Sequence, residues 1–270
     1  MKVLMFGWEF PPHISGGLGT ACFGLTKALS KMGIEIQFIV PKMFGDEDRS
    51  FMQIQGAGDV IIKQNTHFSR YKEFWEKFTY IEVGSTLIPY LYPEDYEKLI
   101  NSQTLKFGTE DIQREIFKED FLFSGTYGKD LYKEVARYAF VAGLIASKRD
   151  FDIIHAHDWL TYPAGIAAKE VSGKQLIVHV HATEYDRSGE NINQTVYDIE
   201  KQGMDIADKV ITVSHLTRNT VIEKYHINPD KVFTVHNSVE PINLPYDFQL
   251  KSAFKEKIVT FLGRVTFQKG

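Results

Sequence analysis

Short apolar runs and helical patterns alternate along most of this chain of 270 residues. An apolar run over residues 2–7 is followed by an amphipathic pattern over 18–32 and a second apolar run over 35–40. Four further apolar runs alternate with helical segments in the second half of the chain. The apolar runs cover 152–155, 175–179, 209–213 and 231–235. The helical segments lie near 163–172, 196–207 and 215–225. This alternation predicts an α/β fold with a doubly wound parallel sheet covered by helices on both faces.

The remaining segments suggest how the chain is divided. Residues 1–240 would form the main Rossmann-like domain, with an insertion at about 43–127 that is rich in Phe and Tyr and carries some secondary structure of its own. Two prolines within 241–256 predict a stiff linker. Residues 257–270 predict the first strand and loop of a second, truncated Rossmann-like domain, so we expect the sequence to be a fragment of a longer protein.

Composition argues against several classes of protein. The formal net charge is −4 and no long basic cluster is present, so we expect no nucleic-acid partner and no polybasic membrane surface. No uninterrupted apolar segment reaches the roughly 18 to 20 residues of a membrane span, so stable membrane insertion is not expected. The single cysteine, Cys22, excludes an intrachain disulfide. Because no export signal is recognisable, we expect a cytoplasmic protein. The sequence leaves the oligomeric state open.

A glycine-rich turn follows the first predicted strand. Gly16 and Gly17 lie where the chain passes into the first predicted helix. Glycines at such a turn let backbone amides approach an anion, which the helix dipole also favours, so the turn predicts a phosphate-bearing ligand. The same glycines can serve only to pack the helix closely on the strand. The glycine spacing is not that of a dinucleotide-binding turn, and Lys42 rather than a carboxylate follows the second strand, which disfavours an NAD-dependent enzyme.

Two His-x-His pairs end successive predicted strands. The first pair is His155 and His157, followed by Asp158, and the second pair is His179 and His181. Residues two apart in a strand share a face, so both pairs are expected near the carboxyl edge of the sheet, where ligands gather. We expect His157 and His181, nearer the loops, to act on a substrate and the other two to be core residues. Imidazoles also bind zinc, and a metal-dependent hydrolase is a less favoured alternative, so no metal is predicted.

Five motifs occur in the order found in one enzyme family. They are Ser15-Gly16-Gly17-Leu18-Gly19, His155-Ala156-His157-Asp158-Trp159, Val210-Ile211-Thr212-Val213-Ser214, Val235-His236-Asn237-Ser238-Val239-Glu240 and Gly263-Arg264-(x)4-Lys269-Gly270. In this order they resemble retaining glycosyltransferases of the two-Rossmann-domain, GT-B type. More narrowly, the chain is similar to the N-terminal domain of bacterial and archaeal glycogen (starch) synthases and related group 1 glycosyltransferases. The resemblance covers the whole chain and is weakest over 43–127.

The resemblance implies an activity. Such enzymes transfer a hexose, here expected to be glucose, from a nucleoside-diphosphate sugar such as ADP-glucose or UDP-glucose to a glycan acceptor, with retention and without a metal or other cofactor. The implied site has three parts: catalytic His157 and Asn237, donor phosphate-binding Gly16, Gly17, Arg264 and Lys269, and acceptor- or sugar-binding Glu9, Asp158 and His181. Because the family's residues that grip the nucleotide would follow Gly270, the chain taken alone is expected to be inactive.

The chain departs from the family pattern at several positions. Ser15 stands where many glycogen and starch synthases have a lysine, and Ser238 stands where a glycine is common. In the helix expected around Arg137, Lys133 and Glu134 replace the usual Asp-Asn. Two alternatives therefore stay open: a related glycosyltransferase that makes a cell-surface polysaccharide or a small glycoside, and a sugar-binding module without catalysis.

Overall fold

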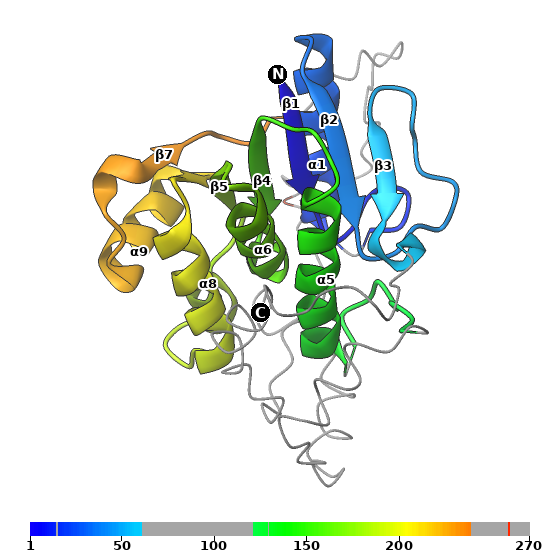
Figure 1. Cartoon of the computed structure of the whole chain (residues 1–270). Coiled ribbons are helices and arrows are strands. Elements are labelled where there is room, and N and C mark those ends of the chain that lie inside the picture. Colours follow the sequence, from blue (N-terminus) through cyan, green and yellow to red (C-terminus); the bar gives the residue numbers. More distant parts are fainter. Residues whose placement is uncertain (15, 61–120, 129, 239–258, 260–270) are drawn as a thin grey trace, which may run out of the picture.

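A seven-stranded parallel sheet forms the centre of the molecule (Figure 1). The computed structural model describes residues 1–14, 16–60, 121–128, 130–238 and 259. The strands are β1 (Lys2–Phe6), β2 (Glu35–Val40), β3 (Gln53–Gly56), β4 (Ile153–His157), β5 (Gln175–Val180), β6 (Lys209–Thr212) and β7 (Val232–Thr234). Their order in the sheet is β3-β2-β1-β4-β5-β6-β7, so the direction of winding changes between β1 and β4. The predicted doubly wound α/β fold is confirmed.

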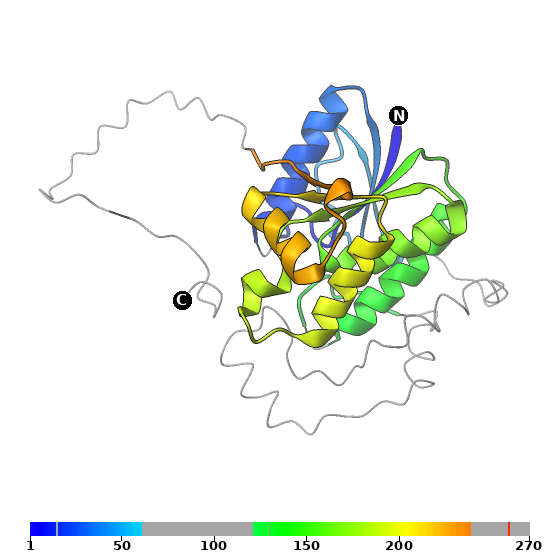
Figure 2. The ribbon, with the colours of Figure 1, turned by 90° about the vertical axis from the view of Figure 1, so that its left-hand side faces the viewer.

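Helices cover the two faces of this sheet (Figure 2). α1 (Gly17–Lys31) packs on one face, and the helices on the other are α5 (Leu131–Ala146), α6 (Tyr162–Ser172), α8 (Gln194–Ile206) and α9 (His215–Tyr225). Short helical turns complete the described residues: α7 (Glu184–Ser188), η1 (Ala57–Asp59), η2 (Trp159–Thr161) and η3 (Pro229–Lys231). Among the described residues, no helix combines the length and the apolar character needed to cross a bilayer.

The alternation of side chains along the strands builds two apolar layers. In β1, Val3 and Met5 contribute to the layer beneath α1, whereas Leu4 and Phe6 contribute to the layer beneath α5 and α6. Because both faces are covered, such strands are near-continuous apolar runs in the sequence. Each fully buried side chain of this kind stabilises the fold by about 1.5–3 kcal/mol relative to exposure. The continuous runs explain why β1, β2, β4 and β5 could be predicted.

Several elements differ from the sequence-based expectations. β3 lies inside the segment that we assigned to an insertion, and it extends the main sheet by pairing with β2. Its sequence, Gln-Ile-Gln-Gly, contains no apolar run. β7 is shorter than expected, because residues 229–231 form the single turn η3 before it. The expected linker 241–256 and the expected second-domain strand and loop 257–270 lie outside the described residues, apart from Val259.

The change of winding fixes where a ligand can be held. All seven strands run in parallel, so their carboxyl ends meet at one edge of the sheet. The connections that leave β1 and β4 run to opposite faces, which opens a crevice between them at that edge in folds of this type. Glu9 and Gly16 lie in the connection that follows β1, and His157 is the last residue of β4.

Candidate functional site

Four histidines line the face of β4 and β5 that is turned toward α1. His157 pairs in register with His179 of the neighbouring strand, and His155 and His181 lie two residues away on the same face. The residues between them, including Ile154, Ala156 and Val178, belong to the apolar layer on the opposite face. We call His155, His157, His179 and His181 the histidine cluster.

The rings of the histidine cluster are in close contact. Nδ1 of His157 lies 3.0 Å from Nε2 of His181, so one ring donates a hydrogen bond to the other. The ring centroids of His155 and His157 are 4.2 Å apart, and those of His179 and His181 are 4.4 Å apart. His157 is fully buried, at 0% exposure, and His181 is partly exposed. His157 is the last residue of β4 and so lies nearer the loops than His155, as expected, yet its side chain is fully buried.

Burial keeps the histidine cluster neutral. It lowers the pKa of His157 and His181 well below the usual 6.5, and the neighbouring imidazoles lower both pKa values further. Burial also lowers the pKa of His155 well below its usual value and that of His179 to about 4. At neutral pH each ring therefore carries one N–H donor and one acceptor nitrogen. The cluster can orient polar groups of a ligand, but it supplies no positive charge.

Several nitrogens of the histidine cluster are buried without a hydrogen-bond partner. They are Nε2 of His155, Nε2 of His157 and both ring nitrogens of His179. Buried polar atoms are paired in the great majority of native structures, so a concentration of unpaired ones marks a place where a polar ligand or water can bind. In the hydrogen-bonded pair of His157 and His181, Nε2 of His157 is buried and has no hydrogen-bond partner.

Potential metal ligands also meet at this position. The ligand atoms of Cys22, His157 and His181 lie within 4.8 Å of one another, as do those of His155, His157 and His179. The rings of His155 and His179 are almost parallel, at 2°, with centroids 5.4 Å apart, so their in-plane lone pairs do not converge on one point. Burial is the main cause that raises the pKa of the Cys22 thiol, which keeps it protonated. These features favour hydrogen bonding over metal ligation.

The loop after β1 folds onto the first turn of α1. Glu9 is buried, with Oε1 accepting a hydrogen bond from the backbone N–H of Gly19 at 3.3 Å and Oε2 accepting one from the Tyr127 hydroxyl at 3.3 Å. Gly19 permits this packing, because a Cβ there would lie 2.3 Å from Cγ2 of Ile14. In this position Glu9 links the loop after β1 to the first turn of α1 and to Tyr127.

The two glycines of the turn lie at the start of α1. Gly16 is the N-cap residue of α1 and has no side chain that could cap the helix, whereas the backbone N–H of Gly19 in the first turn already donates to Glu9. A Cβ added at Gly17 would meet nothing within 4 Å, so the space beside the first turn is open. The backbone N–H groups and the dipole of a helix favour negative charge at such a position.

Asp158 adopts an unusual backbone conformation at the end of β4. Its φ is 64° and its ψ is 163°, a region that non-glycine residues rarely occupy. Its Oδ1 accepts a hydrogen bond from the backbone N–H of Trp159 at 2.9 Å and lies 3.9 Å from Nη1 of Arg187. Burial raises the pKa of the Asp158 carboxyl, and the charge of Arg187 opposes that rise.

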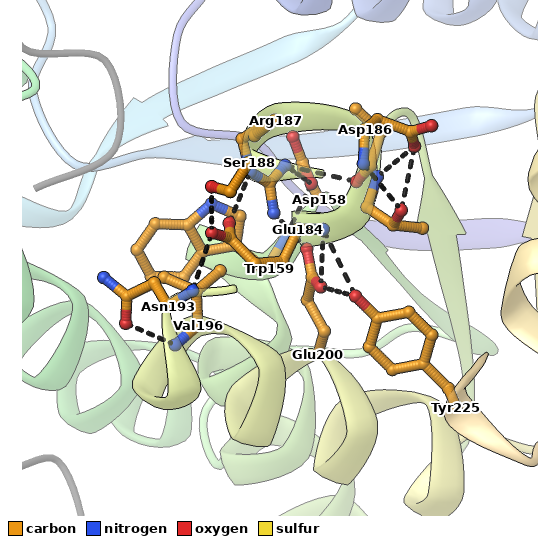
Figure 3. A network of polar contacts seen from close by, with 12 residues as sticks. Asp158, Trp159, Glu184, Asp186, Arg187, Ser188, Asn193, Val196, Glu200 and Tyr225 are labelled. Carbon is orange, nitrogen blue, oxygen red and sulfur yellow. Dashed lines mark hydrogen bonds and ion pairs between the residues drawn. The ribbon is translucent and has the colours of Figure 1, made fainter. Parts of the chain in front are cut away.

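Arg187 belongs to a buried ion network (Figure 3). Its Nε donates to Oε2 of Glu184 at 3.0 Å, and its Nη2 donates to Oε1 of Glu200. The hydroxyl of Tyr225 donates to the second carboxylate oxygen of Glu200. Burial raises the pKa of Glu200 to about 7, even though Arg187 and Tyr225 lower it. We call Asp158, Glu184, Arg187, Glu200 and Tyr225 the Arg187 network.

The predicted site residues are only partly brought together. His157, Asp158 and His181 lie next to one another at the ends of β4 and β5. Asn237 is exposed and follows β7. In the sheet β7 is three strands away from β4, a separation of about 14 Å at a strand spacing of about 4.8 Å. Arg264 and Lys269 lie outside the described residues.

Sequence reasoning missed the buried ion network that follows the second His-x-His pair in the chain. Thr183 and Asp186 form a capping box that starts α7, and Glu184 and Arg187 are spaced three residues apart on it. A Thr-x-x-Asp pattern after a strand is a signal for such a helix start. Glu200 lies on the next helix, and no spacing rule connects it to Arg187.

Comparison with known proteins identifies the family of this chain. The family model described as the starch synthase catalytic domain matches residues 2–233. An uncharacterized glycosyltransferase of Methanocaldococcus jannaschii is 24% identical over 285 residues, an alignment that covers 100% of this chain and 57% of that protein. A glycogen synthase of Mycobacterium tuberculosis is 22% identical over 279 residues, covering 100% of this chain and 56% of that protein. The chain thus spans about half the length of the curated relatives it matches.

A solved structure supports the fold. The sucrose-phosphate synthase of Thermosynechococcus elongatus superposes with a TM-score of 0.52 at 11% sequence identity, covering 87% of this chain and 47% of that chain. At this identity the similarity concerns the arrangement of strands and helices alone. The match over residues 2–233 confirms the resemblance to glycogen synthase-like proteins. The chain belongs to the family of the starch synthase catalytic domain, the glycogen synthase-like group of GT-B proteins.

Proposed function

We propose that this chain is the acceptor-side domain of a retaining glycosyltransferase of the glycogen synthase type. In this proposal a hexose, glucose, passes from a nucleoside-diphosphate sugar, ADP-glucose or UDP-glucose, to a glycan acceptor. Transfer needs no metal and no other cofactor, and it takes place in the cytoplasm. Family membership supports the reaction class, and the named relatives that are glycogen synthases support the type of acceptor.

The observation that carries the proposal is the unpaired Nε2 of His157 next to the 3.0 Å hydrogen bond between His157 and His181. A sugar offers hydroxyl groups that both donate and accept hydrogen bonds. Either neutral tautomer of His157 can therefore bind a hydroxyl through Nε2, with His181 fixing which tautomer is present. Because the ring is fully buried, the residues above it must move before a sugar can reach that nitrogen.

A neutral histidine cannot balance the charge that builds up as a diphosphate leaves. In the proposed reaction this task belongs to Arg264 and Lys269 of the donor side, together with the backbone amides of Gly16 and Gly17 at the start of α1. Fixed cations and helix-end amides stabilise developing negative charge without reorganising during the reaction. In this proposal His157 orients the transferred sugar, and Asn237, which follows β7 three strands away from β4, reaches the same substrate only after moving toward His157.

The decisive experiment measures transfer by the complete gene product. Donors are ADP-glucose, UDP-glucose and other nucleotide sugars, acceptors are glycogen and maltooligosaccharides, and the anomeric configuration of the product is read by NMR. We expect glucose transfer with retention, and His157→Ala to lower turnover on the order of a hundredfold or more in a folded protein. Transfer of another sugar to a different acceptor, or an inverted product, would replace the glycogen synthase assignment.

A matched control separates a site histidine from histidines in general. His226 lies at the other end of the fold, after α9, with a φ of 55°. Asparagine tolerates this left-handed conformation, so His226→Asn should fold and keep parental turnover. Equal activity of His157→Ala and His226→Asn would assign His157 a structural role instead.

A further inference from the structure

The Arg187 guanidinium touches both loops that carry the histidine pair. Its Nη1 lies 3.9 Å from Oδ1 of Asp158, the residue after His157. The same nitrogen donates a hydrogen bond of 3.3 Å to the backbone carbonyl of Ala182, the residue after His181. One nitrogen of a buried side chain therefore connects the residues that directly follow the two hydrogen-bonded rings.

The guanidinium is itself held rigidly. Its Nε and Nη2 are engaged by the carboxylates of Glu184 and Glu200, and the arginine side chain is 5% exposed. α7, which carries Arg187, is fixed at its start by the reciprocal hydrogen bonds of Thr183 and Asp186. A planar guanidinium bound on several edges has little freedom to rotate, so it can act as a rigid support for the loops above it.

The loop after His157 requires such support. Asp158 is held at a φ of 64°, which costs of the order of 1–3 kcal/mol for a non-glycine residue. Its backbone N–H donates to the carbonyl of His179 at 2.9 Å, and the Thr161 hydroxyl donates to the carbonyl of His157 at 2.8 Å. Arg187 is the cation that lies beside the Asp158 carboxylate. Loss of that cation would remove the charge that opposes the burial of the Asp158 carboxylate and would allow the loop to relax.

We propose that Arg187 is a positioning residue for the transfer reaction: by holding Asp158 and Ala182 together it sets the distance and orientation of His157 and His181. The expected effect on the rate of transfer rests on the proposed function, whereas the expected effect on the geometry of the histidine pair does not. A structural ion network would be expected to affect only the stability of the fold. Positioning affects the histidine pair in a protein that is still folded.

The test compares two substitutions of Arg187 with a matched control. Arg187→Lys keeps a positive charge but loses the planar fork, and Arg187→Met removes the charge. Lys169→Met is the control, because it breaks the ion pair between Lys169 and Asp208, which lies before β6 at the amino end of that strand. If Arg187→Met fails to fold, the lysine variant still provides the test.

The first measurement does not depend on catalysis. Nitrogen-15 NMR of the ring nitrogens in the 270-residue chain detects the N–H that His157 and His181 share. We expect this signal to shift or disappear in Arg187→Lys, whose backbone spectrum remains that of a folded protein, and to persist in Lys169→Met. An unchanged histidine pair in folded Arg187→Lys would overturn the proposal.

The second measurement uses the complete gene product with its best donor. We expect kcat to fall by about 10- to 100-fold in Arg187→Lys while KM for the donor changes by less than about threefold, because misplaced groups weaken the transition state more than binding. Lys169→Met should keep the parental kcat. A parental kcat in Arg187→Lys would also overturn the proposal. Absence of transfer by the parent itself counts against the proposed function, and the NMR result then decides the role of Arg187 alone.

Discussion

Nδ1 of His157 and Nε2 of His181 lie 3.0 Å apart, although 24 positions separate the two residues in the sequence. The contact joins the ends of adjacent parallel strands, so it depends on the register of β4 with β5. Because both rings are neutral, their tautomers are coupled. When His181 donates, His157 carries its proton on Nε2 and can donate to a ligand; in the reverse arrangement Nε2 accepts. Whether Nε2 of His157 donates or accepts a hydrogen bond is thus set by His181.

The buried histidines should make the fold sensitive to acid. Burial lowers the pKa of His179 to about 4, below the value of about 6.5 in the unfolded chain, so the unfolded state binds a proton more readily between these values. The free energy of unfolding is therefore unaffected by this titration above pH 6.5. It falls as the pH drops from 6.5 toward 4, by about 3 kcal/mol in total. Urea denaturation between pH 4.5 and 8 should show this loss.

The variant His179→Met identifies the source of that acid sensitivity. Methionine fills a core position without a titrating group, so the free energy of unfolding should depend less steeply on pH below 6.5, by about 1.4 kcal/mol per pH unit. A parental slope in His179→Met would show that His179 is protonated in the folded state.

Close packing of α8 on α6 predicts a large difference between two similar substitutions. A Cβ added at Gly203 would lie 2.4 Å from Cδ2 of Tyr162, a fully buried side chain, whereas a Cβ at Gly24 of α1 would meet nothing within 4 Å. We expect Gly203→Ala to destabilise the fold by about 1–3 kcal/mol through overpacking. Gly24→Ala should stabilise it by up to about 1 kcal/mol, because alanine favours the helix. Thermal unfolding of both variants checks the pair.

The sequence predicted the parts of the fold that one segment determines by itself. β1 and β4 are buried on both faces, so their apolar runs identify them without reference to a partner. β3 is different, because Gln53 and Gln55 alternate with Ile54 and only pairing with β2 makes the segment a strand. The positions of His157 and His181 at one edge of the sheet could be predicted in the same way. Side chains alternate between the two faces of any strand, so the His-x-His spacing alone shows that both histidines of a pair share a face.

The remainder of the site depends on contacts between distant segments. Cys22 of α1 lies near His157 because the helix packs over β4, and nothing in the spacing of the two residues indicates it. Arg187 meets Glu200 only because α7 and α8 fold back together. The conformation of Asp158 is likewise imposed by the surrounding hydrogen bonds, since aspartate has no local preference for a φ of 64° combined with a ψ of 163°.

The single cysteine reports on the opening of the site. Cys22 is fully buried and burial raises the pKa of its thiol, so the reactive thiolate is scarce in the folded protein. We expect Ellman's reagent to label the native chain slowly at pH 8 and to label it at once in denaturant. Because the sequence contains one cysteine, the signal has one source. Rapid labelling of the folded chain would mean that α1 separates from β4 easily.

The Arg187 network should give the fold a pH dependence opposite in sign to that of the histidine cluster. Burial raises the pKa of Glu200 to about 7, above the value of about 4.3 in an unfolded chain. The folded state therefore holds this proton more tightly, and the contribution of Glu200 to stability falls as pH rises from about 4.3 through 7. Over that interval the loss is on the order of 3 kcal/mol.

Glu200→Gln removes this titration and makes the prediction measurable. Both carboxylate oxygens of Glu200 accept hydrogen bonds, from Tyr225 and the backbone of Glu184 on one side and from Arg187 on the other. The NH2 group of the glutamine therefore faces a donor in either orientation, which lowers the free energy of unfolding by an amount that does not depend on pH. The difference in unfolding free energy between parent and Glu200→Gln should therefore shrink by on the order of 2 to 3 kcal/mol between pH 5 and pH 8. A difference that stays constant with pH would mean that Glu200 is ionised throughout this range, with Arg187 compensating its charge fully.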